Sequence, residues 1–481
     1  MFFLILVISL FKASYLISFE GKKISMAIKN SIIIIFMLIS VSVAAQNKSG
    51  IISGPWAGNV ELRNATIWVE VAPTVKHIAV QFAPVGKPLQ QQTVSFKSTP
   101  GNDFNPIKIE LNGLDFNTTY QYSLLINGKK IKPGFSTKFT TKDLWQWRKP
   151  APDFSFLTGS CAYFNETMYD RPGKPYGGDS SIFETMANTP AAFHVWLGDS
   201  WYTREVDYNS AWGLNYRASR DRAQPVLQKF MASMPQYAIW DDHDYGPDDI
   251  GKSYHLKEES RKTFMNFTVN PSYGENGMGI YSVINYSDVD VFLTDDRYFR
   301  SDDKMLDSIN GTLNTDKTYF GKMQMEWLKN ALLYSKATFK LIATGGQVLN
   351  PLSTAECMHS YTKEYNDLLE FLVSQNISGV LFFSGDRHHS EIIKLNRPGL
   401  YPLYDITNSP YTAGVSKVKG VELTNPARVT GTLVEAQNFT KVSVSGNKNE
   451  RVMKVEFIGI KGDKLSEWSV FEKDLKSLEK D

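Results

Sequence analysis

Short apolar runs that end in acids or imidazoles constrain the fold of this chain more than any other feature. Three of them stand out, at residues 193–202, 237–244 and 380–389. The middle run is the most acidic, because it ends in Trp-Asp-Asp-His-Asp at residues 240–244. Carboxylates so close together repel one another when ionised, and burial raises that cost. Such a cluster is therefore either fully solvated or holds a cation, and its repetition favours the cation.

From residue 154 onward, strand-like runs alternate with helical stretches. We expect strands at 154–157, 192–197, 237–240, 289–293, 339–343 and 379–383. We expect helices at 181–188, 222–233, 321–334 and 361–375. After Pro410 the pattern returns to β signals, at 440–444 and 451–458. This alternation predicts a layered α/β fold, with functional side chains at the carboxyl ends of the strands.

Before residue 154, a different sequence pattern predicts a small all-β domain. Apolar and polar residues alternate at 65–71 and 77–82, and Gly, Pro and Asn punctuate these runs. The segment 107–122 has a leucine-rich strand end, a turn and a Tyr-x-Tyr strand, which is typical of a fibronectin-like sandwich. This region carries no cluster of acids or imidazoles, so we interpret it as structural or as a binding accessory.

The N-terminus predicts export. Residues 26–46 combine a basic start at Lys29, an apolar stretch and small residues before a plausible cut after Ala45. We interpret residues 1–25 as a misread upstream extension; a membrane anchor is the alternative. The predicted division is a signal peptide and extension at 1–45, a β-sandwich domain at 46–141 and a catalytic domain at 153–481. The mature protein would be periplasmic or extracellular, without a membrane-spanning segment.

Bulk properties exclude some classes of protein. The formal net charge of +2 gives no reason to expect a nucleic acid or a membrane surface as a stable partner. The two cysteines, Cys161 and Cys357, exclude a disulfide framework but not a single bridge, and we expect two separate thiols.

The polar ends of six predicted strands would meet at one rim. They are residues 159–161, 198–202, 241–244, 294–300, 344–347 and 384–389. A hydrolase with two metal ions needs such a rim: a shared carboxylate bridges the ions, and oxygen, nitrogen and thiolate donors complete each shell. A nearby imidazole protonates the leaving group, and arginine forks hold phosphate oxygens.

Three of these segments, 198–202, 240–244 and 384–388, resemble the motifs of the alkaline phosphatase D (PhoD-like) family of calcineurin-like metallophosphoesterases. The resemblance covers residues 51 to about 414. It implies a layered α/β metallophosphoesterase sandwich with an N-terminal β domain. It also implies hydrolysis of small-molecule phosphate monoesters or diesters outside the cytoplasm.

The resemblance further implies a role for each of several residues. Six would bind metal: Cys161, Asp199, Tyr202, Asp242, Asp386 and His388. Asp199 would bridge two ions. Tyr202 as phenolate, Cys161 as thiolate and His388 would complete the shell of Fe³⁺. Asp242 and Asp386 would bind Ca²⁺, with Zn²⁺, Mn²⁺ or Mg²⁺ as alternatives. His243 would be the general acid, so His243 and Asp199 are the predicted catalytic residues.

Two departures from the wider superfamily carry a consequence. Asp242 replaces an Asn, and the added negative charge favours a hard cation such as Ca²⁺ over Zn²⁺. Gln347 replaces a metal-binding His, which puts a ligand role for it in doubt. Candidates for substrate contact are Gln347, Arg217, Arg297 and Arg300. The alternative for Arg297 and Arg300 is structural ion pairing with Asp295 and Asp296.

Two other functions compete with a phosphoesterase. A secreted binding protein with a degenerate site should have lost a metal ligand or the general acid, yet every predicted one is present. A sugar hydrolase built on paired carboxylates does not explain the tyrosine and cysteine beside the acids.

Overall fold

The computed structural model describes residues 50–96, 101, 103–353 and 356–476. Contacts within the chain divide it into Met1–Gly50 and Ile51–Asp481, and the description below concerns the second unit. The predicted signal peptide and upstream extension therefore lie outside the described residues. Among the described helices, none has the length and hydropathy that crossing a bilayer requires.

The N-terminal strands form two antiparallel sheets. The first has the order β1-β2-β5, made of β1 (Ile51–Gly58), β2 (Asn64–Val71) and β5 (Pro106–Asn112). The second has the order β4-β3-β6-β7, with β8 paired to β6. Its strands are β3 (Ile78–Pro84), β4 (Gln92–Phe96), β6 (Thr119–Ile126), β7 (Lys129–Ile131) and β8 (Lys138–Thr140). Inward-facing side chains such as Val69, Val80 and Leu124 form a hydrophobic core of their own.

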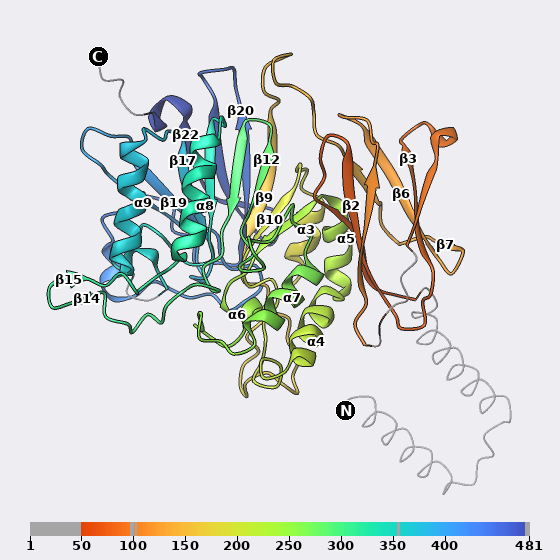
Figure 1. Cartoon of the computed structure of the whole chain (residues 1–481), viewed down its shortest axis with the longest axis horizontal. Helices are drawn as coiled ribbons and strands as arrows, with labels where there is room; N and C mark the ends of the chain where they lie inside the picture. Colours follow the sequence, from red (N-terminus) through yellow and green to blue (C-terminus); the bar gives the residue numbers. More distant parts are fainter. Residues whose placement is uncertain (1–49, 97–100, 102, 354–355, 477–481) are drawn as a thin grey trace, which may run out of the picture. The chain divides into compact units, whose positions relative to one another are not determined.

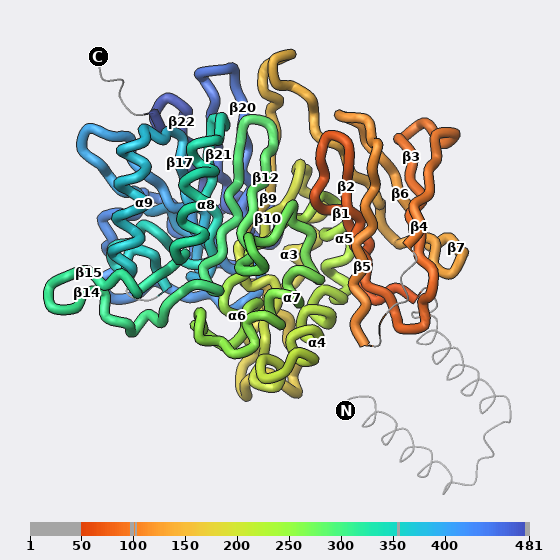
Figure 2. The backbone as a smooth tube through the Cα atoms, viewed as in Figure 1, coloured from red at the N-terminus to blue at the C-terminus, as the bar shows by residue number. Residues whose placement is uncertain are grey.

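A six-stranded sheet of order β11-β10-β9-β20-β21-β22 forms one layer of the larger part. Its strands are β9 (Phe154–Gly159), β10 (His194–Leu197), β11 (Gln236–Ile239), β20 (Asn438–Ser445), β21 (Val452–Gly459) and β22 (Lys464–Phe471). The strands β9, β10 and β11 are parallel, whereas β20 pairs antiparallel with β9. Figure 2 shows how the C-terminal strands return to lie beside the first strands of this part.

A second six-stranded sheet has the order β12-β13-β16-β17-β19-β18. Its strands are β12 (Ser282–Tyr286), β13 (Val289–Leu293), β16 (Phe339–Ala343), β17 (Val380–Ser384), β18 (Glu391–Leu395) and β19 (Leu403–Thr407). The neighbours β13, β16, β17 and β19 are parallel. Strands β13, β16 and β17 are buried on both faces, which explains their largely apolar sequences. A two-stranded hairpin lies outside it, β14 (Ser308–Ile309) with β15 (Thr312–Leu313).

Helices accompany these sheets (Figure 1). They are α3 (Ile182–Ala187), α4 (Ala211–Arg222), α5 (Pro225–Ser233), α6 (Asp242–Tyr245), α7 (Lys257–Phe267), α8 (Gly321–Tyr334) and α9 (Thr362–Ser374). Helix α3 packs against α5, α4 against α7, and α8 against α9. Aromatic and aliphatic side chains from both six-stranded sheets and these helices share one large hydrophobic core.

The predicted class is confirmed: the fold is mixed α/β, with several sheets flanked by helices and with N-terminal strands. Strands β13 and β16 and helix α8 have the predicted bounds. The prediction of a helix at 222–233 was wrong about where that helix begins. Pro225 begins a separate helix, α5, and α4 precedes it. The predicted domain boundaries stay predictions. Hydrogen bonds connect the N-terminal sheets with the helices, for example from Ser53 Oγ to the Arg222 carbonyl at 2.9 Å.

Candidate metal centre

The carboxyl ends of parallel strands place the predicted ligands together. Cys161 follows β9, Asp199 follows β10, and Asp386 follows β17, each by two residues. Glycines allow the close approach of these strand ends: a Cβ at Gly198 would lie 2.5 Å from the Cβ of Asp241. Asp242 is different, because it begins helix α6 rather than ending a strand. Asp241 caps this helix, and its backbone N–H donates to Asp244 Oδ2 at 3.2 Å.

One group of donor atoms converges around Asp199. The ligand atoms of Cys161, Asp199 and His388 all lie within 4.8 Å of one another. Cys161 Sγ is 3.4 Å from Asp199 Oδ2. Tyr202 Oη donates to the same oxygen at 2.9 Å and lies 3.2 Å from His388 Nε2. The four residues that the resemblance implies for the first ion are therefore brought together.

A second group shares Asp199 with the first. Ligand atoms of Asp199, Asp242 and His243 lie within 4.8 Å of one another, as do those of Asp242, Asp248 and Asp249. Asp386 lines the same cavity as Asp199 and Asp242. Asp199 thus lies between the two groups, where a bridging carboxylate must be. The metal role of each residue stays a prediction.

The backbone is strained at four of the six predicted ligands. Cys161, Asp199, Asp386 and His388 have φ values of +63°, +52°, +61° and +56°. Non-glycine residues rarely adopt this left-handed conformation, which costs about 1–3 kcal/mol at each position. Strain of this kind persists where the surroundings impose it and is concentrated at functional sites. The conformation turns each side chain from its strand end into the shared rim.

The pKa values of the rim residues indicate that this site needs positive charge. Burial raises the pKa of Asp199 well above its ordinary value, and the charges of Cys161 and Asp242 add to this. Burial also raises the pKa of the Cys161 thiol to about 12 and that of Asp386 to about 7. The pKa of Tyr202 rises for the same reason, with Asp199 as the next cause. A bound cation stabilises all of these groups in their anionic, ligating forms, so the residues fit a metal site.

His243 lies at the edge of both groups. Its ring is 4.1 Å from that of Tyr202, between centroids. Its Nε2 is 3.7 Å from Asp242 Oδ2 and 3.4 Å from Asp248 Oδ1, whereas Nδ1 is buried without a hydrogen-bond partner among the described residues. Burial lowers the pKa of His243, and the carboxylates of Asp242 and Asp248 oppose this shift. The side chain stays partly exposed, so it can reach a molecule in the cavity.

Buried ion pairs hold the rim from behind. Arg297 contacts Asp241 and Glu356, and Arg300 contacts Glu356 at 2.9 Å and Asp303 at 2.7 Å. The predicted alternative partners, Asp295 and Asp296, were wrong as ion-pair partners. Asp295 instead accepts hydrogen bonds from Trp240 Nε1 and from the backbone of Arg297 and Tyr298.

The predicted substrate-contacting residues lie behind the cavity wall and not on it. Arg217, Arg297 and Gln347 are fully buried, and Arg300 is nearly so. Arg217 pairs with Asp207 at 2.8 Å and Glu166 at 2.9 Å. Gln347 donates to Glu391 at 2.9 Å and Thr407 at 2.8 Å and accepts from Asn350. Because these side chains are buried and held by protein partners, a phosphate contact by any of them would require the cavity wall to rearrange.

Other polar residues line the cavity, whose volume is about 650 Å³. Sequence reasoning missed Tyr176, Glu356, Arg387, Lys417 and Lys419. Arg387 stands between two predicted ligands, so its place in the motif could have identified it. The others come from irregular loops that no apolar run marks. Tyr176 Oη lies 2.9 Å from His388 Nδ1, and Arg387 pairs with Glu422 at 2.8 Å.

Solved structures share this fold. A structure of PhoD matches with a TM-score of 0.71 at 16% identity, over 88% of this chain and 90% of that chain. A purple acid phosphatase from yellow lupin (Lupinus luteus) seeds matches with a TM-score of 0.61 at 12% identity, over 88% of this chain and 75% of that chain. The chain therefore shares its fold with PhoD and with a purple acid phosphatase.

Residues 156–461 match the PhoD-like phosphatase family, and the chain belongs to that family. The resemblance predicted from the motifs is thereby confirmed. Alkaline phosphatase D of Bacillus subtilis (strain 168) is 22% identical over 327 residues, which cover 59% of this chain. The match spans about half of that relative, 53% of its length.

Proposed function

We propose that this protein is an exported, metal-dependent phosphoesterase that hydrolyses small-molecule phosphate monoesters, diesters or both. Family membership supports the reaction class. The observation that carries the proposal is the convergence of Cys161, Asp199, Tyr202 and His388 at one point, with Asp242 and His243 beside it. A degenerate binding protein would not keep every donor and hold four of the predicted ligands in a strained backbone.

The donor types favour two different cations. A thiolate, a phenolate and an imidazole nitrogen from Cys161, Tyr202 and His388 suit Fe³⁺, with Asp199 as the shared ligand. The carboxylates of Asp242 and Asp386 are hard oxygen donors, which favour Ca²⁺ as the second ion. When bound, such a pair of ions activates water and neutralises the phosphoryl oxygens.

The remaining steps fall to residues of the chain. His243 faces the cavity with Nε2 near two carboxylates, which oppose the lowering of its pKa by burial. In this proposal its protonated form donates to the leaving oxygen of the ester. Arg387, held by Glu422, and the exposed Lys417 and Lys419 give the cavity wall positive charge for the anionic substrate. Asp244 keeps the loop after β10 in position, because its Oδ1 accepts from Ser200 N at 2.9 Å and Ser200 Oγ at 2.7 Å.

One experiment tests the proposal directly. The mature protein, purified after export, is analysed for metals by mass spectrometry and assayed on one monoester and one diester. We expect iron and calcium together with hydrolysis of at least one ester. A phenolate or thiolate bound to Fe³⁺ also gives a visible charge-transfer band, which Tyr202→Phe should shift or weaken. A metal-loaded protein without activity on either ester would contradict the proposed function.

A further inference from the structure

The second N-terminal sheet is built from two stretches of sequence without a single carboxylate. Residues 72–102 and 116–142 contain eight lysines and no Asp or Glu. The whole chain has a formal net charge of only +2, so the remaining sequence is net negative. Positive charge is therefore in excess in the two stretches that supply one sheet, β4-β3-β6-β7 with β8. We call it the basic sheet.

The lysines of the basic sheet lie exposed to solvent. Lys87, Lys129, Lys130, Lys132 and Lys138 are all exposed, and within the described residues none of them forms an ion pair with a carboxylate. Near the rim, by contrast, the basic side chains of Arg217, Arg297 and Arg300 are buried and paired with carboxylates. An exposed, uncompensated group of this kind attracts anions.

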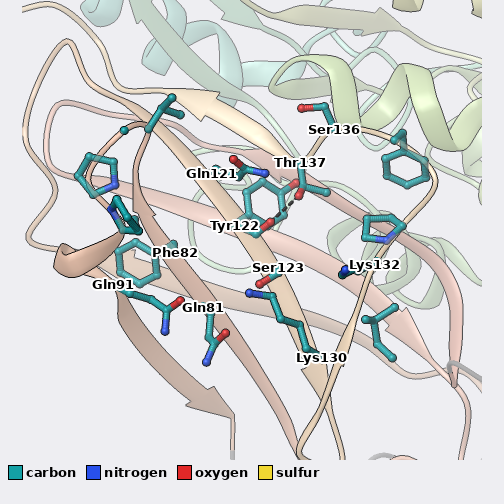
Figure 3. A pocket seen from close by; sticks show the side chains of 18 residues that line it. Gln81, Phe82, Gln91, Gln121, Tyr122, Ser123, Lys130, Lys132, Ser136 and Thr137 are labelled. Carbon is teal, nitrogen blue, oxygen red and sulfur yellow. Dashed lines mark hydrogen bonds between the residues drawn. The ribbon is translucent and has the colours of Figure 1, made fainter.

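A groove crosses the outer face of this sheet (Figure 3). Strand β6 alternates, so that Tyr120, Tyr122 and Leu124 enter the core while Gln121 and Ser123 face outward. On β3, Gln81 is paired with Ser123 and faces outward beside it. The segment 130–137 forms the opposite wall and carries Lys130 and Lys132. The enclosed volume is about 520 Å³, which is enough for a few sugar rings.

The side chains that line the groove indicate which kind of anionic partner it fits. Amides of Gln81, Gln91 and Gln121 and the hydroxyl of Ser123 both donate and accept, which matches the hydroxyl groups of a sugar. The lysines Lys130 and Lys132 match acidic groups along the same molecule. Phe135 supplies an apolar surface for a sugar ring face. A concave, amide-lined groove is unsuited to a flat lipid surface.

We propose that the basic sheet binds a chain of an acidic polysaccharide along this groove. The proposal is independent of the phosphoesterase reaction, because it concerns the outer face of a sheet whose inner face packs in a separate hydrophobic core. Its role would be to keep the enzyme on an anionic extracellular or envelope polymer. No covalent step is involved.

The test measures binding of the full mature protein to polygalacturonate by isothermal titration calorimetry at low salt. Neutral dextran is the uncharged comparison, and phosphatidylglycerol vesicles are the lipid comparison. We expect binding to polygalacturonate alone, which weakens as salt is added. The double variant Lys130→Gln/Lys132→Gln should bind roughly 5-fold more weakly. Hydrolysis of a small ester should be unchanged in this variant.

Two further variants separate a built groove from general attraction. Gln81→Ala/Gln121→Ala keeps every charge and should still weaken binding. Lys322→Gln/Lys336→Gln removes two exposed lysines far along the chain and should leave binding unchanged. Equal effects of the two lysine pairs, no effect of the glutamine pair, or tighter binding to dextran or vesicles would each overturn the proposal.

Discussion

The rim and the basic sheet use charge in opposite ways. At the rim, carboxylates such as Asp241 and Asp199 are buried and depend on Arg297 or on bound cations for compensation. On the basic sheet, the lysines are exposed and have no carboxylate partner within the described residues. Burying a charge is costly unless it is paired, whereas an exposed charge contributes little to stability. Substitutions at the rim should therefore abolish its function, whereas substitutions on the basic sheet should only change which anions it attracts.

The largest effect should follow removal of the shared carboxylate. Asp199 contacts Cys161 and Tyr202 and belongs to both groups of donors, so Asp199→Asn weakens both ion sites together. We expect loss of bound metal and a fall in kcat/KM of about 10³-fold or more. Mass spectrometry for metals and ester hydrolysis measure the two effects, with the exposed Asp302→Asn as a control. Near-normal turnover in Asp199→Asn would remove the two-metal interpretation.

Loss of His243 should separate proton donation from metal binding. A positioned general acid contributes roughly 10²–10⁴-fold, and mainly where the leaving group is poor. His243→Ala should therefore keep its metals, lose that factor on alkyl phosphates and lose less on esters of acidic phenols. The exposed His255→Ala serves as the control. Equal losses on both ester types, or loss of a metal, would assign His243 to the coordination shell.

The buried ion pairs should matter for stability even without substrate. Arg297→Met leaves Asp241 buried without its guanidinium partner and removes one of the two arginines that pair with Glu356. Breaking such a pair from one side costs about 3–5 kcal/mol in the free energy of unfolding. The matched change Arg171→Met removes an exposed pair with Glu205 and should cost less than about 1 kcal/mol. Urea unfolding compares the two variants, and similar losses would contradict the distinction between buried and exposed charge.

A smaller, pH-dependent effect is expected at Glu70 in β2. Burial raises the pKa of Glu70 from 4.5 to about 7, although the hydrogen bond from Ser219 at 2.7 Å opposes the shift. Between these values the folded state binds more protons than the unfolded state, so stability falls as the pH rises through this window. The full loss, roughly 3 kcal/mol, is present above pH 7.

Glu70→Gln removes this titration. The variant should gain stability over the parent at about pH 8 and match it at about pH 4, since only the parent loses stability between them. Urea unfolding at both pH values measures this, with the exposed Glu110→Gln as the control. An advantage of equal size at both pH values would show that Glu70 does not titrate in this way.

Much of the fold follows from local patterns in the sequence. Strands such as β13 and β16 are buried on both faces, so their apolar runs have defined ends, and helix α8 keeps a regular apolar face. Strands β12 and β22 were not predicted, because their partly exposed residues lack a continuous apolar run. The boundary between α4 and α5 depends on a single proline.

The site was predictable where chemistry and spacing coincide in one motif. Asp199 and Tyr202 stand three residues apart, and Asp386 and His388 two apart, so the motif alone suggested their convergence. The burial of Arg217 and Gln347 could not be predicted, because it depends on partners 10 to 60 residues away. The cavity wall from Tyr176 and Lys417 likewise arises from loops that only the tertiary fold brings together.

The left-handed backbone at the predicted ligands lowers the stability of the fold but positions the side chains that the proposed reaction needs. At Asp386, φ is +61°, so a glycine there would remove the backbone strain. It would also remove the cost of burying a carboxylate. Selection for stability alone would therefore favour glycine at this position, and the proposed metal role accounts for the aspartate. A stabilised, inactive descendant of this chain would first lose its acids at such positions and would keep its sheets intact.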